Sequence, residues 1–362
     1  MDVYSGEQLA NMSLPSSPTE LRYTAHRIAD IIYERLTGAP GAFTSRLAYV
    51  TSEWGVEGQR VTLRVADADG HNPQTIVSSK EPLMSPAWSP DGRRLAYVSF
   101  ENRQTAVFVQ ELATGRRERV ASFPGINSSP AWSPDGKQIA FVSNRDRKSD
   151  LYLVNGNGNG VHRLTDSHTW EANPVWSPDG TRVAFISDRD GNYEIYALSV
   201  DDGQLRRLTE TRAEEWNPAW SPDGRRIAYI RNDDGDCQVW CWEDGTARQI
   251  THDAGHCSEP AWLDNDRLVY VYSSPVTVPD LYGVPADDQW RCFLGPLVPG
   301  TPQEPMALVP APCRGLHPTG ERVTAATVQY RGQPAFYAFV GLGTLVSDGV
   351  PGAYAMRFLG LV

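Results

Sequence analysis

A seven-residue phrase, Pro-Ala-Trp-Ser-Pro-Asp-Gly or a close variant, recurs four times in this chain at a constant interval of 44 residues. The copies occupy residues 86–92, 130–136, 174–180 and 218–224. After two variable residues each copy is followed by a short apolar run, of which Leu95-Ala96-Tyr97-Val98 is the first. A period of about 40 to 45 residues with several strands in each repeat is typical of propeller blades. The chain is therefore predicted to be a repeat protein.

The Ser-Pro-Asp-Gly part of the phrase has the composition of a tight turn. In the first copy the Ser89 hydroxyl can accept a backbone hydrogen bond, and Pro90 fixes φ. Asp91 tolerates the bridge or left-handed region, and Gly92 adopts a positive φ without steric cost. Two further strands follow in each unit, for example over residues 194–198 and 205–208. Four antiparallel strands per unit predict an all-β fold made of propeller blades.

Six apolar second strands can be counted, and they predict a six-bladed β-propeller. They begin at Leu47, Leu95, Ile139, Val183, Ile227 and Leu268. The first unit has no Pro-Ala-Trp strand before it, so the C-terminal region is expected to close the ring. Residues 322–330, 334–340 and 353–361 are candidates for that strand. A weak match to the repeat around residues 317–320 leaves a seventh blade as an alternative. Ten prolines between residues 275 and 318 predict loop or irregular edge after about residue 275.

Residues 1–40 lie outside the repeat. Residues 2–14 are predicted to form a hairpin, and a helix follows with Ser17 as N-cap, Pro18 in its first turn and Glu20 completing a capping box. The apolar stripe of this helix consists of Leu21, Ala25, Ile28, Ile32 and Leu36. A hairpin and one helix are too small to bury a core. The segment therefore either packs on the propeller or is the end of a larger domain.

Composition argues against several functional classes. The chain of 362 residues has a formal net charge of −11 and no cluster of Lys and Arg, so nucleic acid is not an expected partner. No apolar stretch approaches 18 residues, and residues 1–4 do not read as a secretory signal. No Gly-x-Ser-x-Gly sequence occurs, and the spacing within residues 252–257 matches no metal site. We expect a non-enzymatic protein without cofactor or metal.

Four loops that lead from the fourth strand of one blade to the first strand of the next are the candidate binding sites. They span residues 122–129, 166–173, 210–217 and 252–259. Aromatic residues beside acidic and polar ones on rigidly held loops are typical of protein-binding anchors. The alternative is that the tryptophans pack beneath their own loops. The candidate partner-binding residues are His168, Trp170, Glu171, Asn173, Glu215, Trp216, Asn217, His256 and Glu259.

The sequence around the helix resembles a known family. The run over residues 21–38, then Gly41-Ala42-Phe43 and residues 46–50, is similar to the junction of the two domains in the TolB family, the periplasmic propeller proteins of the Tol-Pal cell-envelope system. Residues 65–70 and 83–92 continue the resemblance in the same order, and it covers about residues 2–275. The order of helix, linker and first blade is more specific than the repeat phrase alone.

This resemblance implies a fold, a location and a partner. It implies a monomeric periplasmic scaffold that docks the peptidoglycan-associated lipoprotein Pal on the loops named above, with other Tol proteins as further partners, and that supports outer-membrane integrity and cell division. In the family a complete α/β domain precedes the helix, so residues 1–40 are expected to be its remnant and residues 41–362 the propeller. The family's TolA-contacting segment has no counterpart here, and TolA binding through it is not expected. A propeller module of a hydrolase or peptidase, and a small-ligand or glycan-binding propeller, are the alternatives.

Overall fold

The structure is a computed structural model of the 362-residue chain. It describes residues 14–17, 20–37, 41, 43–55, 58–67, 70–252, 255–262, 265, 267–274, 277–285, 323–330, 333–339, 344–347 and 350–353.

One helix and a succession of antiparallel sheets make up the described chain. The helix is α1 (Leu21–Thr37). The first sheet holds β1 (Arg46–Gly55), β2 (Gly58–Asp67) and β3 (Gln74–Ser79). The second holds β4 (Leu83–Trp88), β5 (Arg94–Ser99), β6 (Ala106–Glu111) and β7 (Arg117–Ala121). The third holds β8 (Asn127–Trp132), β9 (Gln138–Ser143), β10 (Asp150–Asn155) and β11 (His162–Arg163).

Three more sheets and a hairpin follow. The fourth sheet holds β12 (Glu171–Trp176), β13 (Arg182–Ser187), β14 (Glu194–Ser199) and β15 (Leu205–Arg207). The fifth holds β16 (Glu214–Trp220), β17 (Arg226–Asp233), β18 (Asp236–Glu243) and β19 (Thr246–Gln249). The sixth holds β20 (His256–Trp262), β21 (Arg267–Ser274) and β22 (Thr277–Pro285). The C-terminal strands are β23 (Val323–Tyr330), β24 (Gln333–Phe339), β25 (Thr344–Ser347) and β26 (Val350–Ala353).

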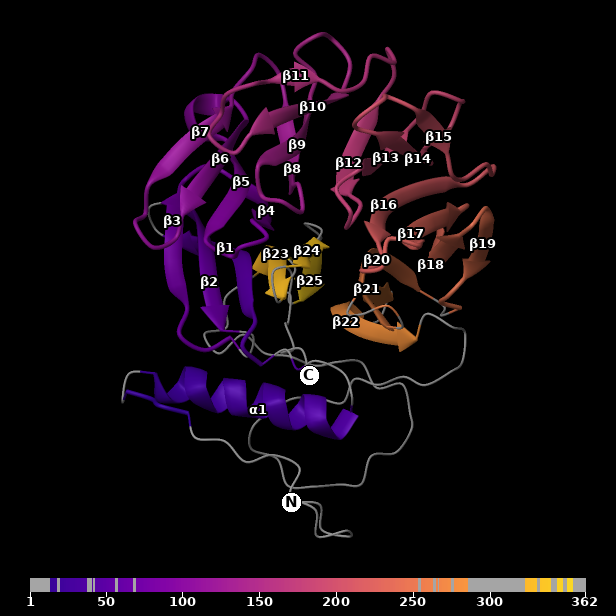
Figure 1. The fold of residues 1–362 in the computed structure, drawn as a ribbon. Helices are drawn as coiled ribbons and strands as arrows, with labels where there is room; N and C mark the ends of the chain where they lie inside the picture. The colour runs from indigo at the N-terminus through magenta and orange to yellow at the C-terminus, as the bar shows by residue number, and fades with distance from the viewer. Residues whose placement is uncertain are drawn as a thin grey trace.

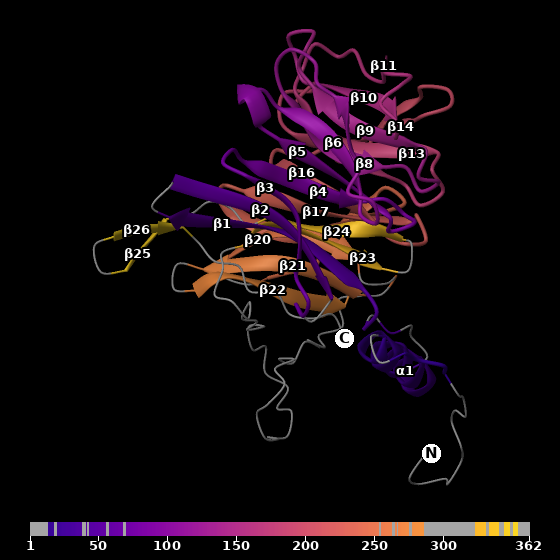
Figure 2. The ribbon, with the colours of Figure 1, turned by 90° about the vertical axis from the view of Figure 1, so that its left-hand side faces the viewer.

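The six sheets follow one another around a ring and form a six-bladed propeller (Figure 1). Within blades 2 to 5 the strands pair in sequence order, with the first strand innermost and the fourth on the outside. Figure 2 shows the ring edge-on, with α1 on one side and the β25–β26 hairpin on the other. The predicted fold class is confirmed.

The C-terminal region closes the ring, as the missing first strand of blade 1 predicted. Strand β23 pairs antiparallel with β1, so residue 47 faces residue 328, and the sheet order is β24-β23-β1-β2-β3. Blade 1 therefore has five strands, and β24 lies beside β20 and β4 near the centre of the ring. In blade 6 the outermost described strand is β22, an edge position that tolerates its prolines. The faint unit at residues 317–320 and the alternative closing strand at 353–361 fall almost wholly outside the described residues.

The predicted turn is built as its sequence requires. In blade 3 the backbone N–H of Gln138 donates to Ser133 Oγ at 2.9 Å, and that hydroxyl donates to Asp135 Oδ1 at 2.6 Å. The Asp135 carboxylate also accepts from the Lys137 N–H, and Gly136 has a φ of +69°. Ser89, Ser177 and Ser221 make the same bond to the residue five positions on. The turn therefore fixes how the first and second strands of each blade meet.

The repeated tryptophan and an arginine that the sequence analysis did not single out join adjacent blades. Trp132 Nε1 donates to the carbonyl of Ala87 in the preceding blade at 3.2 Å, and Trp176 and Trp262 repeat the bond to Ala131 and Ala219. The Arg94 guanidinium lies 4.4 Å from the centre of the Trp132 ring and donates to the Gly136 carbonyl at 2.9 Å. Arg46, Arg182 and Arg226 stack on Trp88, Trp220 and Trp262 in the same way. These contacts join each of blades 1 to 5 to the blade that follows it.

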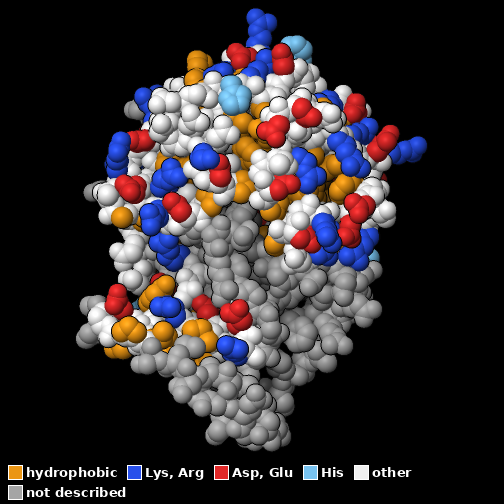
Figure 3. All heavy atoms as spheres, viewed as in Figure 1, with side chains coloured by type: hydrophobic (Ala, Val, Ile, Leu, Met, Phe, Trp, Pro, Cys, Tyr) orange, Lys and Arg blue, Asp and Glu red, His pale blue; other side chains and the backbone are white. Residues whose placement is uncertain are grey.

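The helix is tied to the propeller by polar contacts. Arg22 Nε pairs with Asp67 at the end of β2 at 3.1 Å, and the buried Asp30 carboxylate accepts from Phe43 N–H at 2.7 Å and from the Thr44 hydroxyl at 2.6 Å. Ser17 Oγ donates to Glu20 at 2.8 Å just before the first turn. The predicted apolar stripe is exposed at Leu21, Ala25, Ile28 and Ile32, and hydrophobic side chains are visible on α1 in Figure 3. The predicted hairpin over residues 2–14 lies outside the described residues except at its last position.

Within the described residues, no helix has the length and apolar character that crossing a membrane requires.

Candidate partner-docking face

The propeller has two faces with different kinds of loop. The Ser-Pro-Asp-Gly turns lie where the first strands end, and the connections from one blade to the next lie where the first strands begin. Those connections are residues 122–126, 164–170, 208–213 and 250–255. A six-residue strand such as β12 spans roughly 20 Å, so the two sets of loops are well separated. The predicted binding loops therefore share one face.

Among the described residues, three large apolar side chains are exposed on this face, one from each of three consecutive blades. Ile126 and Trp170 hold the same repeat position, immediately before β8 and β12, and are 45% and 43% exposed. Met84, the second residue of β4, is also exposed. We call Met84, Ile126 and Trp170 the rim cluster. Large apolar side chains that remain exposed on a rigid scaffold are typical of interaction sites.

The backbone under the rim cluster is held rigidly. The Ile126 N–H donates to Asn144 Oδ1 at 2.5 Å, and the Trp170 N–H donates to Asp188 Oδ1 at 2.7 Å. Lys148 Nζ lies 5.8 Å from the centre of the Trp170 ring, within range of a cation–π interaction. The indole is thus presented on a fixed backbone beside a positive charge.

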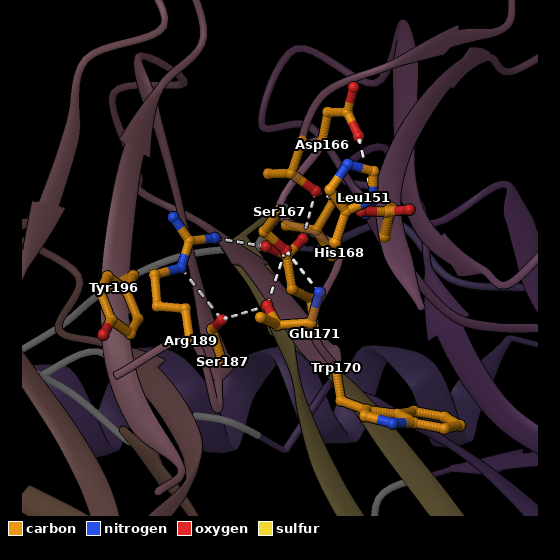
Figure 4. A network of polar contacts seen from close by, with 12 residues as sticks. Leu151, Asp166, Ser167, His168, Trp170, Glu171, Ser187, Arg189 and Tyr196 are labelled. Carbon is orange, nitrogen blue, oxygen red and sulfur yellow. Dashed lines mark hydrogen bonds and ion pairs between the residues drawn. The ribbon is translucent and has the colours of Figure 1, made fainter. Parts of the chain in front are cut away.

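Glu171 follows Trp170 directly but has the opposite environment. Its carboxylate is buried, forms an ion pair with Arg189 and accepts from the Thr165 hydroxyl, whose oxygen in turn accepts from the Leu151 N–H at 2.9 Å. Burial raises the pKa of Glu171, and the hydrogen bonds and Arg189 oppose that rise. Figure 4 shows this network, with the Trp170 ring pointing away from it. Glu171 therefore holds the base of the loop, and Trp170 is the residue presented to solvent.

His168 lies at the tip of the same loop. Its side chain is highly exposed, and its Nδ1 is 4.0 Å from the Asp166 carboxylate. Its backbone φ of +58° is in the left-handed region. His256 is also exposed and holds the repeat position of Ile126 and Trp170 at the start of β20. These two histidines and the rim cluster lie on the same face.

In blade 5 the equivalent loop is packed differently. Glu215 is fully buried and accepts from the Thr211 hydroxyl at 2.6 Å. Trp216 is half-buried and packs against hydrophobic clusters that include Tyr229 and Cys257. Trp216 therefore packs beneath its own loop, which was the alternative considered for the predicted tryptophans, whereas Trp170 is exposed.

The remaining three predicted residues lie on the innermost strands. Asn173, Asn217 and Glu259 occupy a β-bulge position with φ values of +52°, +51° and +51°. The Asn173 amide donates to Asn217 Oδ1, and Asn217 Nδ2 donates to Glu259 Oε1 at 2.6 Å, so one hydrogen-bonded arc joins blades 4, 5 and 6. Water still reaches part of the Glu259 side chain, yet burial among the inner strands raises its pKa to about 8. This arc is distinct from the exposed rim.

Met84 and Ile126 were not among the residues predicted from the sequence. The signal that could have found Ile126 is its separation of 44 residues from Trp170, which places it at the same point of the preceding repeat. Within the described residues, no three His, Cys, Asp or Glu side chains are arranged to hold a metal ion.

Comparison with known proteins gives consistent matches. A family model described as the TolB beta propeller domain matches residues 33–297. The Tol-Pal system protein TolB of Thioalkalivibrio sulfidiphilus is 56% identical over 129 residues, which are 35% of this chain and 29% of that protein. The corresponding protein of Nitrosococcus oceani is 57% identical over 128 residues, 35% of this chain and 30% of that protein. These matches thus span less than a third of the length of the relatives.

Solved structures agree with the fold. The crystal structure of TolB from Acinetobacter baumannii matches with a TM-score of 0.67 and 31% identity, covering 79% of this chain and 75% of that one. A puromycin-hydrolyzing peptidase of Mycobacterium tuberculosis matches with a TM-score of 0.52 at 17% identity, covering 67% of this chain and 44% of that one. The second likeness shows a shared fold alone.

Proposed function

Because this chain belongs to the family of TolB β-propeller domains, we propose that it is a non-enzymatic protein-binding scaffold of the Tol-Pal cell-envelope system. We propose the periplasm as its location and a Pal-like peptidoglycan-associated lipoprotein as the partner on the rim face. The relatives are named as Tol-Pal system proteins, which supports the assignment to that system. Support of outer-membrane integrity and cell division would follow from the same docking.

The observation that carries the docking proposal is the rim cluster. Binding energy at protein interfaces is concentrated in a few large side chains, with tryptophan foremost, surrounded by polar groups that exclude water. Trp170 is exposed next to Lys148 on a backbone fixed by Asp188, and the polar residues Asp166 and His168 belong to the same loop. We therefore propose Trp170 as the main anchor, with Ile126 and Met84 contributing from the two preceding blades and His168 and His256 as polar contacts.

The other predicted residues take supporting roles in this proposal. Glu171 and Glu215 hold the bases of their loops, and the arc of Asn173, Asn217 and Glu259 fixes the inner strands relative to one another. No observation on the described residues favours a peptidase module or a glycan-binding propeller over the docking scaffold.

The test is the affinity of the purified chain for the soluble domain of a peptidoglycan-associated lipoprotein, measured by calorimetry. Trp170→Ala is expected to weaken binding about 30-fold, which corresponds to about 2 kcal/mol for an anchor tryptophan. Leu205→Ala is the matched control, because Leu205 is 41% exposed but lies at the opposite end of blade 4. An unchanged affinity for Trp170→Ala, or an equal loss for the control, would refute the assignment.

A further inference from the structure

The junctions between blades carry the same buried polar position in three versions. A polar residue on the third strand of one blade faces a residue on the first strand of the next. The pairs are Asp150 with Glu171, Glu194 with Glu215, and Gln238 with Cys257. All six side chains are buried. Three different pairs of side chains can therefore be compared at the same position of the fold.

The junction between blades 4 and 5 holds two buried carboxyl groups that bond the same residue, Thr211. Glu194 Oε1 accepts from Arg207 at 2.9 Å and from the Thr211 N–H at 2.8 Å, and Glu215 Oε1 accepts from the Thr211 hydroxyl at 2.6 Å. The second oxygen of each group is buried and has no hydrogen-bond partner among the described residues. Each carboxyl group also shifts the pKa of the other. Two ionised carboxylates buried side by side repel each other, and Arg207 pairs with Glu194 but not with Glu215, so we expect the pair to retain a proton.

The surrounding charges decide which group holds that proton. Burial by itself would raise the pKa of Glu194, but the hydrogen bonds from Thr209, Glu215, Thr211 and Arg207 outweigh it and lower the pKa. Burial raises the pKa of Glu215 to about 8, and the negative Glu194 adds to the rise while Thr211 and Arg231 oppose it. Arg231 is engaged by Asp233 at 2.9 Å, Asp190 pairs with Arg207, and the Tyr229 hydroxyl is buried nearby. The proton therefore belongs to Glu215.

The neighbouring junctions show that the propeller does not need such a pair. Between blades 3 and 4 each acid has its own arginine, Asp150 with Arg163 at 2.6 Å and Glu171 with Arg189. Between blades 5 and 6 the position is neutral, and Gln238 Oε1 accepts from the Thr251 hydroxyl at 2.7 Å. Only the Glu194–Glu215 version of these three depends on a bound proton.

We propose that a proton held by Glu215 next to Glu194 locks blade 4 to blade 5, and that its release as pH rises through neutrality loosens the loop of residues 208–213 and the start of β16. The closed junction binds this proton, whereas an opened junction exposes Glu215 to water, where its ordinary pKa returns. Opening therefore becomes easier as pH rises from about 5 to about 8, by up to about tenfold per pH unit, and levels off above that range. Any effect of this opening on the affinity for a docked partner rests on the proposed function, whereas the pH-dependent opening itself does not.

Hydrogen exchange of the backbone N–H groups of residues 208–216 in the full chain, at pH 5.5 and 7.5 and corrected for the intrinsic exchange rate, tests the lock. The wild-type opening constant is expected to rise by tens of fold between the two pH values. Glu215→Gln places a permanent N–H donor against Glu194, so its opening constant is expected to change by less than threefold. Glu259→Gln removes a half-buried glutamate outside the junction and should keep the wild-type pH response at residues 208–216.

A second variant covers the case in which Glu215→Gln folds poorly. The double change E194Q/E215C transplants the neutral pair of the blade 5–6 junction and should likewise abolish the pH response. The same response in wild type and in either junction variant would overturn the proposal. Partner affinity at the two pH values is measured separately, so that loss of the docking function and loss of the lock are distinguishable.

Discussion

Arg94→Gln is the sharpest test of how adjacent blades are joined. Arg94 is the first residue of β5, the second strand of blade 2; it stacks on the Trp132 ring at 4.4 Å and donates to the Gly136 carbonyl at 2.9 Å. Blade 3 has Gln138 at the same repeat position. The substitution therefore introduces a residue that this protein already uses at the site, so the side chain fits while both cationic contacts are lost.

The expected cost follows from those two contacts. A partly buried cation–π pair contributes about 0.5–2 kcal/mol, and a hydrogen bond from a charged donor contributes about 1.5–3 kcal/mol. Arg94 is half-buried and water replaces part of the lost hydrogen bonding, so the free energy of unfolding is expected to fall by about 2 kcal/mol. The reciprocal change Gln138→Arg adds a cation over Trp176 and is expected to stabilise by about 0.5–1 kcal/mol.

Urea unfolding followed by tryptophan fluorescence and far-UV circular dichroism measures both values. A double-mutant cycle of Arg94→Gln with Trp132→Phe isolates the pair, and its coupling energy is expected to be about 1 kcal/mol. The reasoning fails if Arg94→Gln changes stability by less than about 0.5 kcal/mol, the range of an unremarkable surface substitution.

Two further predictions concern the turn and the central arc. Ser133→Ala removes the buried hydroxyl that bonds Gln138 N–H and Asp135, and is expected to lower the free energy of unfolding in urea by about 1–2 kcal/mol. The control Thr114→Ala changes an exposed residue and should stay within about 0.5 kcal/mol of wild type. Equal effects of the two substitutions would contradict the role of the turn. Glu259 has a folded-state pKa of about 8, above its ordinary value, so its contribution to stability is fully present below about pH 4.5 and is lost as pH rises through 8. Glu259→Gln is therefore expected to stay within about 1 kcal/mol of wild type near pH 5 and to exceed it by about 3 kcal/mol more at pH 8; a constant difference at both pH values would exclude this titration.

Local chemistry made the blade predictable from sequence. The Ser-Pro-Asp-Gly turn needs a hydroxyl acceptor, a fixed φ and a positive φ in succession, and Ser133 to Gly136 realise all of these. The sequence also showed that the C-terminal region had to supply a closing strand, because blade 1 lacked its first strand. Which C-terminal segment supplies that strand depends on pairing between residues far apart in the sequence, such as 47 and 328, which are 281 positions apart. Pairing at that distance has no local signal.

The site was less predictable because exposure changes from one residue to the next. Trp170 and Glu171 are adjacent in sequence, and alternate residues of an extended strand point to opposite faces. The sequence placed both in one loop, whereas β12 begins at Glu171, which turns the carboxylate inward and leaves the indole outside. The arc from Asn173 to Glu259 depends on a bulge with positive φ, for which asparagine is a weak indicator and glutamate is none.

The most direct test of the docking face is a hydrogen-exchange footprint of the chain with and without the lipoprotein domain. We expect protection at residues 122–126 and 164–170, which carry or adjoin the rim cluster, and none at the turns around residues 134–136 and 178–180 on the other face. Protection confined to those turns, or to α1, would contradict it.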